Sequence, residues 1–139
     1  MKERLLRSLG LASAAGAGLY AYASYAARRF EDLDHDSAGA PGAFVDVDGV
    51  PIHYVEAGQG DNVLLIHGLG ASTFSFRHII PELAQHYRVV ALDLKGFGYS
   101  GRPPKSDYSL TAQADLVRAV MDRLRIEQAA VVGHSMGGA

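Results

Sequence analysis

The chain has 139 residues, a formal charge of −2 from 13 basic and 15 acidic residues, and no cysteine. The length favours one domain, and the balanced charge excludes a nucleic-acid-binding surface, which needs a clear basic excess. The absence of cysteine excludes a disulfide framework and a cysteine-ligated metal site. The six histidines include no His-x-x-x-His pair, so the sequence predicts no metal site.

Twenty uncharged residues, 8–27, follow a basic N-terminus. A helix of that length spans about 30 Å, the hydrocarbon thickness of a bilayer. Tyr20, Tyr22 and Tyr25 lie towards its end, as amphipathic rings do at a membrane interface. We expect residues 1–30 to be a membrane anchor or signal segment, so that the protein is held on the membrane by a single N-terminal helix or exported to the cell envelope. Basic residues flank both ends, so the orientation is not predicted.

The same stretch is weakly hydrophobic, with eight alanines and only three leucines. A secretory signal peptide, cleaved after a small-x-small site such as residues 21–23, is therefore an alternative, and a soluble alanine-rich helix is another. Residues 31–42 are acidic, then small with proline and glycine, and show no apolar periodicity. They are expected to form a flexible linker, which leaves residues 43–139 as the globular domain.

The globular domain opens with a predicted hairpin. Apolar residues on either side of Asp48-Gly49 form two strands around a turn typical of antiparallel pairs. His53 is expected at an outward, surface position of the second strand. The continuous apolar run 63–66 predicts a strand buried on both faces.

A His-Gly-Leu-Gly sequence at 67–70 follows that strand. Ser72 or Thr73 can cap the next helix, and Pro81 should divide it into two short helices. Residues 87–92 predict another buried strand, which ends at Asp93.

Residues 96–101 match Gly-x-Gly-x-x-Gly, the pattern of a dinucleotide-binding turn. Such a turn must open a helix whose N-terminus holds the pyrophosphate. Here Arg102-Pro103-Pro104 follows, and consecutive prolines cannot continue into a helix at that point. The sequence therefore predicts no nucleotide cofactor.

A helix is predicted from Ser109 or Thr111 to about residue 124. Its expected sheet-facing side chains recur every three or four residues, at Leu110, Ala114, Val117, Val120 or Met121, and Leu124. A buried strand is predicted at 129–132. It runs into Gly-x-Ser-x-Gly at Gly133, Ser135 and Gly137, a spacing that suits a serine on a tight strand-to-helix turn.

From Phe44 to Ala139 these motifs resemble the α/β-hydrolase superfamily, and Gly133 to Gly138 resembles its nucleophile elbow. The resemblance implies an α/β fold, here a partial one: the N-terminal hairpin, then parallel strands with crossover helices, preceded by the hydrophobic N-terminal helix. It also implies that Ser135 is the nucleophile. The oxyanion hole would use the backbone N–H of Met136 and one from the 67–70 loop, where we choose Leu69 over Gly70.

The resemblance gives His67, Asp93 and Ser100 structural rather than catalytic roles. In this family the acid and histidine of the triad follow the serine along the chain, and only four residues follow Ser135 here. We therefore expect the chain to be the N-terminal part of an enzyme, inactive and poorly soluble alone.

The expected function is a serine hydrolase that acts on an ester or related small-molecule acyl substrate without a cofactor. Serine at the elbow argues against the haloalkane dehalogenase and epoxide hydrolase branches, which need a carboxylate there. A perhydrolase or C–C bond hydrolase of the same fold is an alternative. A non-catalytic binding module is another, because a fold does not determine a function.

Overall fold

The computed structural model describes residues 16–22, 24–25 and 39–139. The chain divides into two units, residues 1–38 and 39–139. In the first unit, residues 16–22 and 24–25 are helical. Most of the predicted anchor and of the 31–42 linker lies outside the described residues. Within the described ranges, no helix combines the length and the apolar character needed to cross a membrane.

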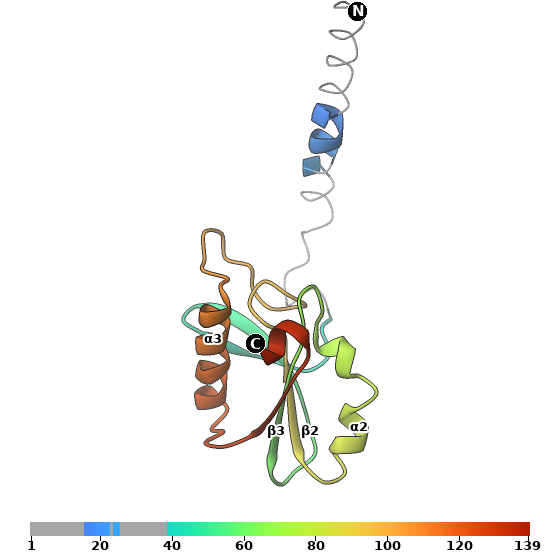
Figure 1. Cartoon of the computed structure of the whole chain (residues 1–139), viewed down its shortest axis with the longest axis vertical. Helices are drawn as coiled ribbons and strands as arrows, with labels where there is room; N and C mark the ends of the chain where they lie inside the picture. The colour runs from blue at the N-terminus through green and yellow to red at the C-terminus, as the bar shows by residue number, and fades with distance from the viewer. Residues whose placement is uncertain (1–15, 23, 26–38) are drawn as a thin grey trace, which may run out of the picture. The chain divides into compact units, whose positions relative to one another are not determined.

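The second unit is built on a five-stranded mixed sheet (Figure 1). Its strands are β1 (Ala43–Val47), β2 (Val50–Ala57), β3 (Asn62–Ile66), β4 (Arg88–Leu92) and β5 (Ala130–Gly133). They lie in the order β1-β2-β4-β3-β5. β2 pairs antiparallel with both β1 and β4, whereas β3 pairs parallel with both β4 and β5. The predicted fold class is confirmed: a hairpin leads into parallel strands.

Four helical segments connect or follow the strands: the 3₁₀ helices η1 (Thr73–Phe76) and η2 (Ser135–Gly138), and the α-helices α2 (Ile80–Leu83) and α3 (Leu110–Arg123). The predicted caps and break are confirmed. The Ser72 and Ser109 side chains accept backbone N–H groups of η1 and α3, and Pro81 lies in the first turn of α2. Figure 1 shows α2 and α3 on opposite sides of the sheet.

Two apolar cores lie on the two faces of the sheet. Alternate side chains of β3 divide between them, because successive strand residues point to opposite faces. Leu64 belongs to the core beneath α3, and Leu65 to the core that Ile80 of α2 completes. The continuous apolar run of β3 is thus explained by burial on both sides.

The buried face of α3 agrees with the predicted one in its second half, where Val120 is buried and Val117, Met121 and Leu124 pack against the core, and differs from it in the first half. Gln113, Leu116 and Val120 are buried, whereas Leu110 and Ala114 are exposed. A glutamine is tolerated on the buried face because its side-chain amide pairs with the backbone of Lys95. Its oxygen accepts the Lys95 N–H at 3.2 Å, and its nitrogen donates to the Lys95 carbonyl at 2.9 Å.

The prediction that the 129–132 segment is buried is wrong. The strand β5 forms, but Val131 and Val132 are 57% and 45% exposed. β5 is one of the two edge strands of the sheet and pairs with β3 alone. Within residues 39–139, all four of its residues are exposed.

The prediction that His53 is a surface residue is also wrong, because its ring is fully buried. β2 is an inner strand, and loop residues cover the face on which His53 lies. The His53 ring contacts the Phe44 ring at 5.2 Å and the Tyr99 ring at 5.1 Å between centroids. Alternation along one strand cannot reveal a cover that comes from a distant loop.

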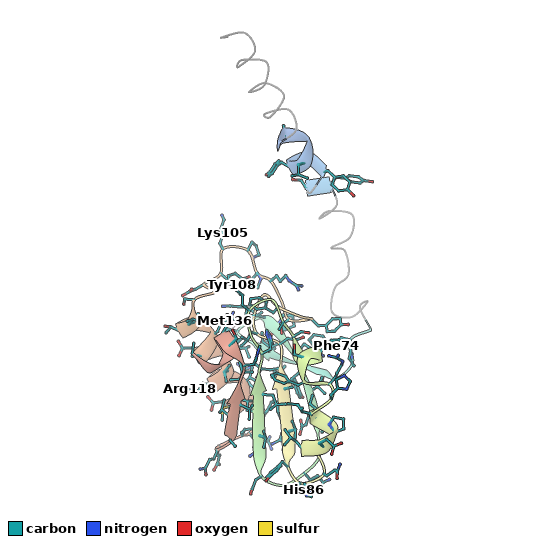
Figure 2. The ribbon with its side chains drawn as sticks, turned by 45° about the vertical axis from the view of Figure 1, so that its right-hand side comes forward. Phe74, His86, Lys105, Tyr108, Arg118 and Met136 are labelled. Atoms are coloured by element: carbon teal, nitrogen blue, oxygen red, sulfur yellow. The ribbon has the colours of Figure 1, made fainter. Side chains whose placement is uncertain are left out.

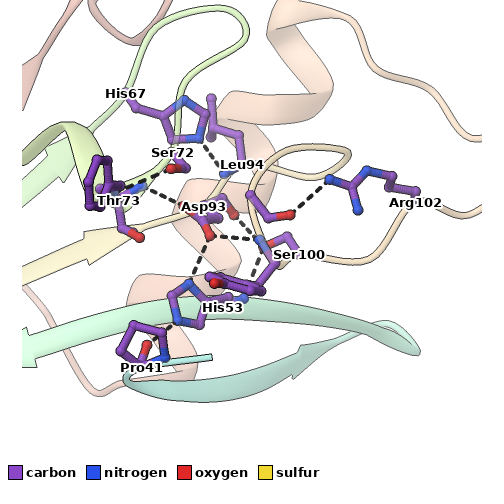
Figure 3. Close-up of polar contacts among 12 residues, drawn as sticks. Pro41, His53, His67, Ser72, Thr73, Asp93, Leu94, Ser100 and Arg102 are labelled. Atoms are coloured by element: carbon purple, nitrogen blue, oxygen red, sulfur yellow. Dashed lines mark hydrogen bonds and ion pairs between the residues drawn. The ribbon is translucent and has the colours of Figure 1, made fainter. Parts of the chain in front are cut away.

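Figure 2 shows Met136, Tyr108 and Phe74 towards one end of the strands and His86 at the other. At the end that carries Met136, the buried Asp93 carboxylate joins three segments (Figure 3). Its Oδ2 accepts the Nδ1–H of His53 at 2.8 Å and the Tyr99 N–H at 2.9 Å. Its Oδ1 accepts the Thr73 N–H at 2.6 Å. These bonds fix β2, η1 and the 94–101 loop to the end of β4.

The pairing of His53 with Asp93 changes the pKa of both side chains. Burial alone lowers the pKa of His53, but the hydrogen bonds to Asp93 and to the Pro41 carbonyl, with the charge of Asp93, outweigh burial and raise it. Burial alone raises the pKa of Asp93, but the hydrogen bonds from His53, Thr73 and Tyr99 outweigh burial and lower it. His53 therefore stabilises the fold below its unfolded pKa of about 6.5, and Asp93 does so above about 3.9.

We predict that His53→Gln lowers the free energy of unfolding of the full-length protein by about 3–5 kcal/mol at pH 5.5, because one partner of a buried pair is lost. The difference from wild type should shrink as the pH rises towards 9, through the raised pKa of His53. Urea denaturation at both pH values measures it. Exposed His86→Gln is the control and should cost less than about 0.5 kcal/mol. A difference that grows with pH would contradict the prediction.

Candidate active site

Ser135 is the first residue of η2, one residue after the end of β5, and has a positive φ of 54°. Non-glycine residues rarely adopt this region, because Cβ then crowds the following carbonyl. The residue is exposed, and its hydroxyl forms no hydrogen bond with any described residue. The turn therefore holds a hydroxyl in an unusual backbone conformation, open to solvent, at the end of a parallel strand.

Glycines make this turn possible. A Cβ on Gly133 would collide with the Gly137 carbonyl oxygen, and a Cβ on Gly137 would collide with the Ile66 carbonyl oxygen. A Cβ on Gly68 would stand 3.0 Å from the Cβ of Ser135. Three glycines from two segments thus let the serine turn pack directly against the loop that follows β3.

The loop after β3 is held by His67, which is fully buried. Its Nδ1 donates to the Gly68 carbonyl at 2.7 Å, and its Nε2 accepts the Leu94 N–H at 3.0 Å. The Phe97 ring packs edge-on against it, with 5.6 Å between centroids. Both ring nitrogens are occupied, so His67 fixes the loop to the end of β4 and has no free nitrogen for Ser135.

The structure brings the three predicted site residues into one region. Leu69 and Met136 line the same cavity of about 350 Å³, and Met136 directly follows Ser135. The Leu69 N–H has no acceptor among residues 39–139. Met136 lies in the first turn of η2, where a backbone N–H lacks an intrahelical acceptor. Within residues 39–139, the Leu69 and Met136 N–H groups and the Ser135 hydroxyl therefore all lack a hydrogen-bond partner.

No side chain among residues 39–139 is hydrogen-bonded to the Ser135 hydroxyl, so no base contacts it within this part of the protein. The only histidine–carboxylate pair within residues 39–139 is His53–Asp93, which is buried in the fold and hydrogen-bonded on both sides. Ser100 is equally enclosed: it is 1% exposed, and its Oγ donates to the Asp93 carbonyl at 2.6 Å. These groups hold the site in place and do not face it.

Sequence reasoning missed His53 and Gln113 as supports of this region. His53 stands beside Ile52, which is also fully buried. Its position within an apolar strand is the only feature of the sequence that indicates its burial. Gln113 had a similar signal, since it stands one helical turn before Leu116. In both cases the partner lies far along the chain, at Asp93 and Lys95.

Comparison with known proteins identifies the family. Residues 61–139 match the family model described as alpha/beta hydrolase fold. A bifunctional epoxide hydrolase 2 from Sus scrofa is 44% identical over 92 residues, which cover 65% of this chain and 17% of that protein. A 2-hydroxy-6-oxo-6-(2'-aminophenyl)hexa-2,4-dienoic acid hydrolase from Metapseudomonas resinovorans is 41% identical over 102 residues, 69% of this chain and 34% of that protein.

Among solved structures, a membrane phospholipase A described as a bacterial virulence factor is similar to this chain, with a TM-score of 0.69 and 33% sequence identity. The similarity covers 99% of this chain and 45% of that one. The chain thus spans less than half the length of each of these three relatives. The family model matches more than half of the chain. The chain belongs to the α/β-hydrolase family.

Proposed function

We propose that the full-length protein is a serine hydrolase that cleaves a small-molecule ester through Ser135. The observation that carries the proposal is the serine itself: an exposed hydroxyl at φ 54°, on a strand-to-helix turn that only glycines allow. This is the geometry of a nucleophile raised above a sheet. Membership in the α/β-hydrolase family and the relative from Metapseudomonas resinovorans, which is named a hydrolase, support it.

In this proposal, Ser135 Oγ attacks the ester carbonyl carbon while a histidine takes its proton. The carbonyl oxygen becomes negative and accepts hydrogen bonds from the Leu69 and Met136 amides. The C–O bond then breaks, and the alcohol leaves with the proton. Water hydrolyses the acyl-enzyme and restores the hydroxyl. Since this chain spans less than half of its longer relatives, we place the histidine and its acid in the rest of the full-length protein.

A C–C bond hydrolase is the second candidate. The relative from Metapseudomonas resinovorans, whose name gives a hexadienoic acid as its substrate, favours it. The same serine and amides would serve that reaction. Turnover of a 2-hydroxy-6-oxo-dienoate without turnover of simple esters would select this candidate over the first.

We predict that a fluorophosphonate probe labels the full-length protein and that Ser135→Ala abolishes the labelling, because the probe needs an activated serine. Exposed Ser75, also in a 3₁₀ helix, provides the matched control: Ser75→Ala should label as wild type. Intact-protein mass spectrometry measures the adduct. Labelling that persists in Ser135→Ala would exclude this serine, and an unreactive full-length protein would favour the non-catalytic binding module.

We predict that substitutions of Gly137 and Gly138 differ in their effect on the rate of fluorophosphonate labelling. In Gly137→Ala the new Cβ meets the Ile66 carbonyl oxygen, so the turn must shift. A shift of about 1 Å at a reacting atom costs roughly 100-fold in rate. In Gly138→Ala the nearest atom stands 3.4 Å away, so the labelling rate should stay close to wild type. Equal rates in the two variants would contradict the geometry of the turn.

We also propose that residues 1–30 anchor the protein on a membrane, where its substrate would be a lipid ester. Two observations support this: the uncharged stretch 8–27, and the membrane phospholipase A structure, whose similarity covers 99% of this chain. A cleaved signal segment is the alternative.

We predict that the full-length protein sediments with membranes and resists carbonate extraction, and that deletion of residues 2–30 releases it. The change removes the uncharged stretch 8–27, whose transfer into lipid would hold the protein on the membrane. Immunoblotting of the fractions measures it. A released wild-type protein with its N-terminus beyond residue 23 would instead establish a cleaved signal peptide.

A further inference from the structure

A cavity opens beside the predicted oxyanion residues and combines apolar walls with one cation. Its volume is about 350 Å³, and its lining residues are Leu69, Gly96, Phe97, Arg102, Tyr108 and Met136. Leu69 and Met136 carry the amides assigned to the oxyanion. A group bound in this cavity would therefore belong to the same substrate molecule that Ser135 attacks.

The walls of the cavity are positioned by the fold. Phe97 is held by its edge contact with the buried His67 ring. Tyr108 is held by a hydrogen bond from its hydroxyl to the Pro103 carbonyl at 2.8 Å, and Lys95 Nζ lies 5.4 Å from its ring centroid. The cavity is thus a built feature of the loops that follow β3 and β4.

Arg102 is the charged residue of the lining. One of its terminal nitrogens donates to the Gly98 carbonyl at 2.8 Å, as Figure 3 shows. Within residues 39–139 it forms no ion pair with a carboxylate. A guanidinium carries five N–H donors, so this single bond orients the group and leaves donors for a ligand.

The charged residues near the cavity also favour a negatively charged ligand. Lys95 and Lys105 add two further cations on the segment from β4 to α3, against two acids, Asp107 and the buried Asp93, which is paired with His53. The Asp107 carboxylate already accepts the Ser109 N–H at 2.8 Å. The segment that forms one side of the cavity therefore carries three basic residues against two acids, and both acids are already hydrogen-bonded.

We propose that this cavity binds a negatively charged group of the substrate, a carboxylate or a phosphodiester, through the guanidinium of Arg102. The inference rests on the proposed function and narrows it to esters that carry an anion. A planar guanidinium can present two parallel N–H groups to either anion. The apolar walls then accommodate the carbon chain between the anion and the reacting carbonyl.

The test compares two esters of equal length in the full-length enzyme: 4-nitrophenyl hemiglutarate, which ends in a carboxylate, and its terminal amide, which is neutral. Wild type should prefer the anionic ester. In Arg102→Gln the ratio of kcat/KM for the anionic ester to that for the amide should fall roughly tenfold, mostly through KM, as expected for the loss of one partly solvated charged contact. Arg102→Lys should restore part of the ratio.

Arg118→Gln is the matched control, because Arg118 is exposed on α3, away from the cavity lining (Figure 2). Its ratio should equal that of wild type. A second pair of substrates, dihexanoylphosphatidylglycerol and dihexanoylglycerol, compares a phosphodiester with a neutral ester. If the anionic-to-neutral ratio of kcat/KM is larger for this pair than for the glutarate pair, the site prefers a phosphodiester; if it is smaller, the site prefers a carboxylate. Raising the ionic strength should weaken the preference in wild type, because salt screens exposed charges.

The outcomes separate the two proposals. An unchanged ratio in Arg102→Gln, or an equal loss on both esters, would overturn the anion site and leave Arg102 as a structural brace for the Gly98 carbonyl. Turnover of neither ester, with no labelling that depends on Ser135, would overturn the proposed function and this inference with it.

Discussion

The Asp93 carboxylate is the interaction on which the arrangement of this site depends. It stands at the end of β4, fully buried, and accepts hydrogen bonds from β2, from the start of η1 and from the loop after β4. A buried charge is tolerated only when its oxygens are satisfied, so these segments must keep their places together. Gly98 packs so close to the carboxylate that a side chain there would collide with it. The next residue, Leu94, holds His67 through its backbone N–H. The end of one strand thus positions both loops that line the cavity.

Much of the fold could be predicted because its signals are local. The Asp48-Gly49 turn has two positive φ angles, 53° and 80°, which suit a tight hairpin. The serine caps and Pro81 act within one turn of the helices that they begin or divide. The serine turn could be found for the same reason, since glycine spacing and a preceding apolar run are both visible within nine residues. The position of Leu69 beside Met136 came instead from resemblance to a family.

The errors arose where the decisive partner is distant in sequence. His53 is buried by Tyr99 and paired with Asp93, forty or more residues later. Gln113 can face inwards on α3 because its side-chain amide pairs with the backbone of Lys95. β5 has the composition of an inner strand, and its exposure follows from its place at the edge of the sheet. None of these facts is encoded in periodicity. The N-terminal segment lies mostly outside the described residues, so its role stays a prediction.

The pairing of β3 has a consequence for how the site is assembled in time. β3 lies between β4 and β5, and Val63 aligns with Val89 on one side and with Ala130 on the other. Long-range pairing of parallel strands is slow, because the entropy of closing a large loop is lost before any stabilising contact forms. Because synthesis starts at the N-terminus, the hairpin, β3 and β4 also leave the ribosome before β5, the strand that carries the serine turn. The strands on which the serine turn packs can therefore be in place before the turn itself is synthesised.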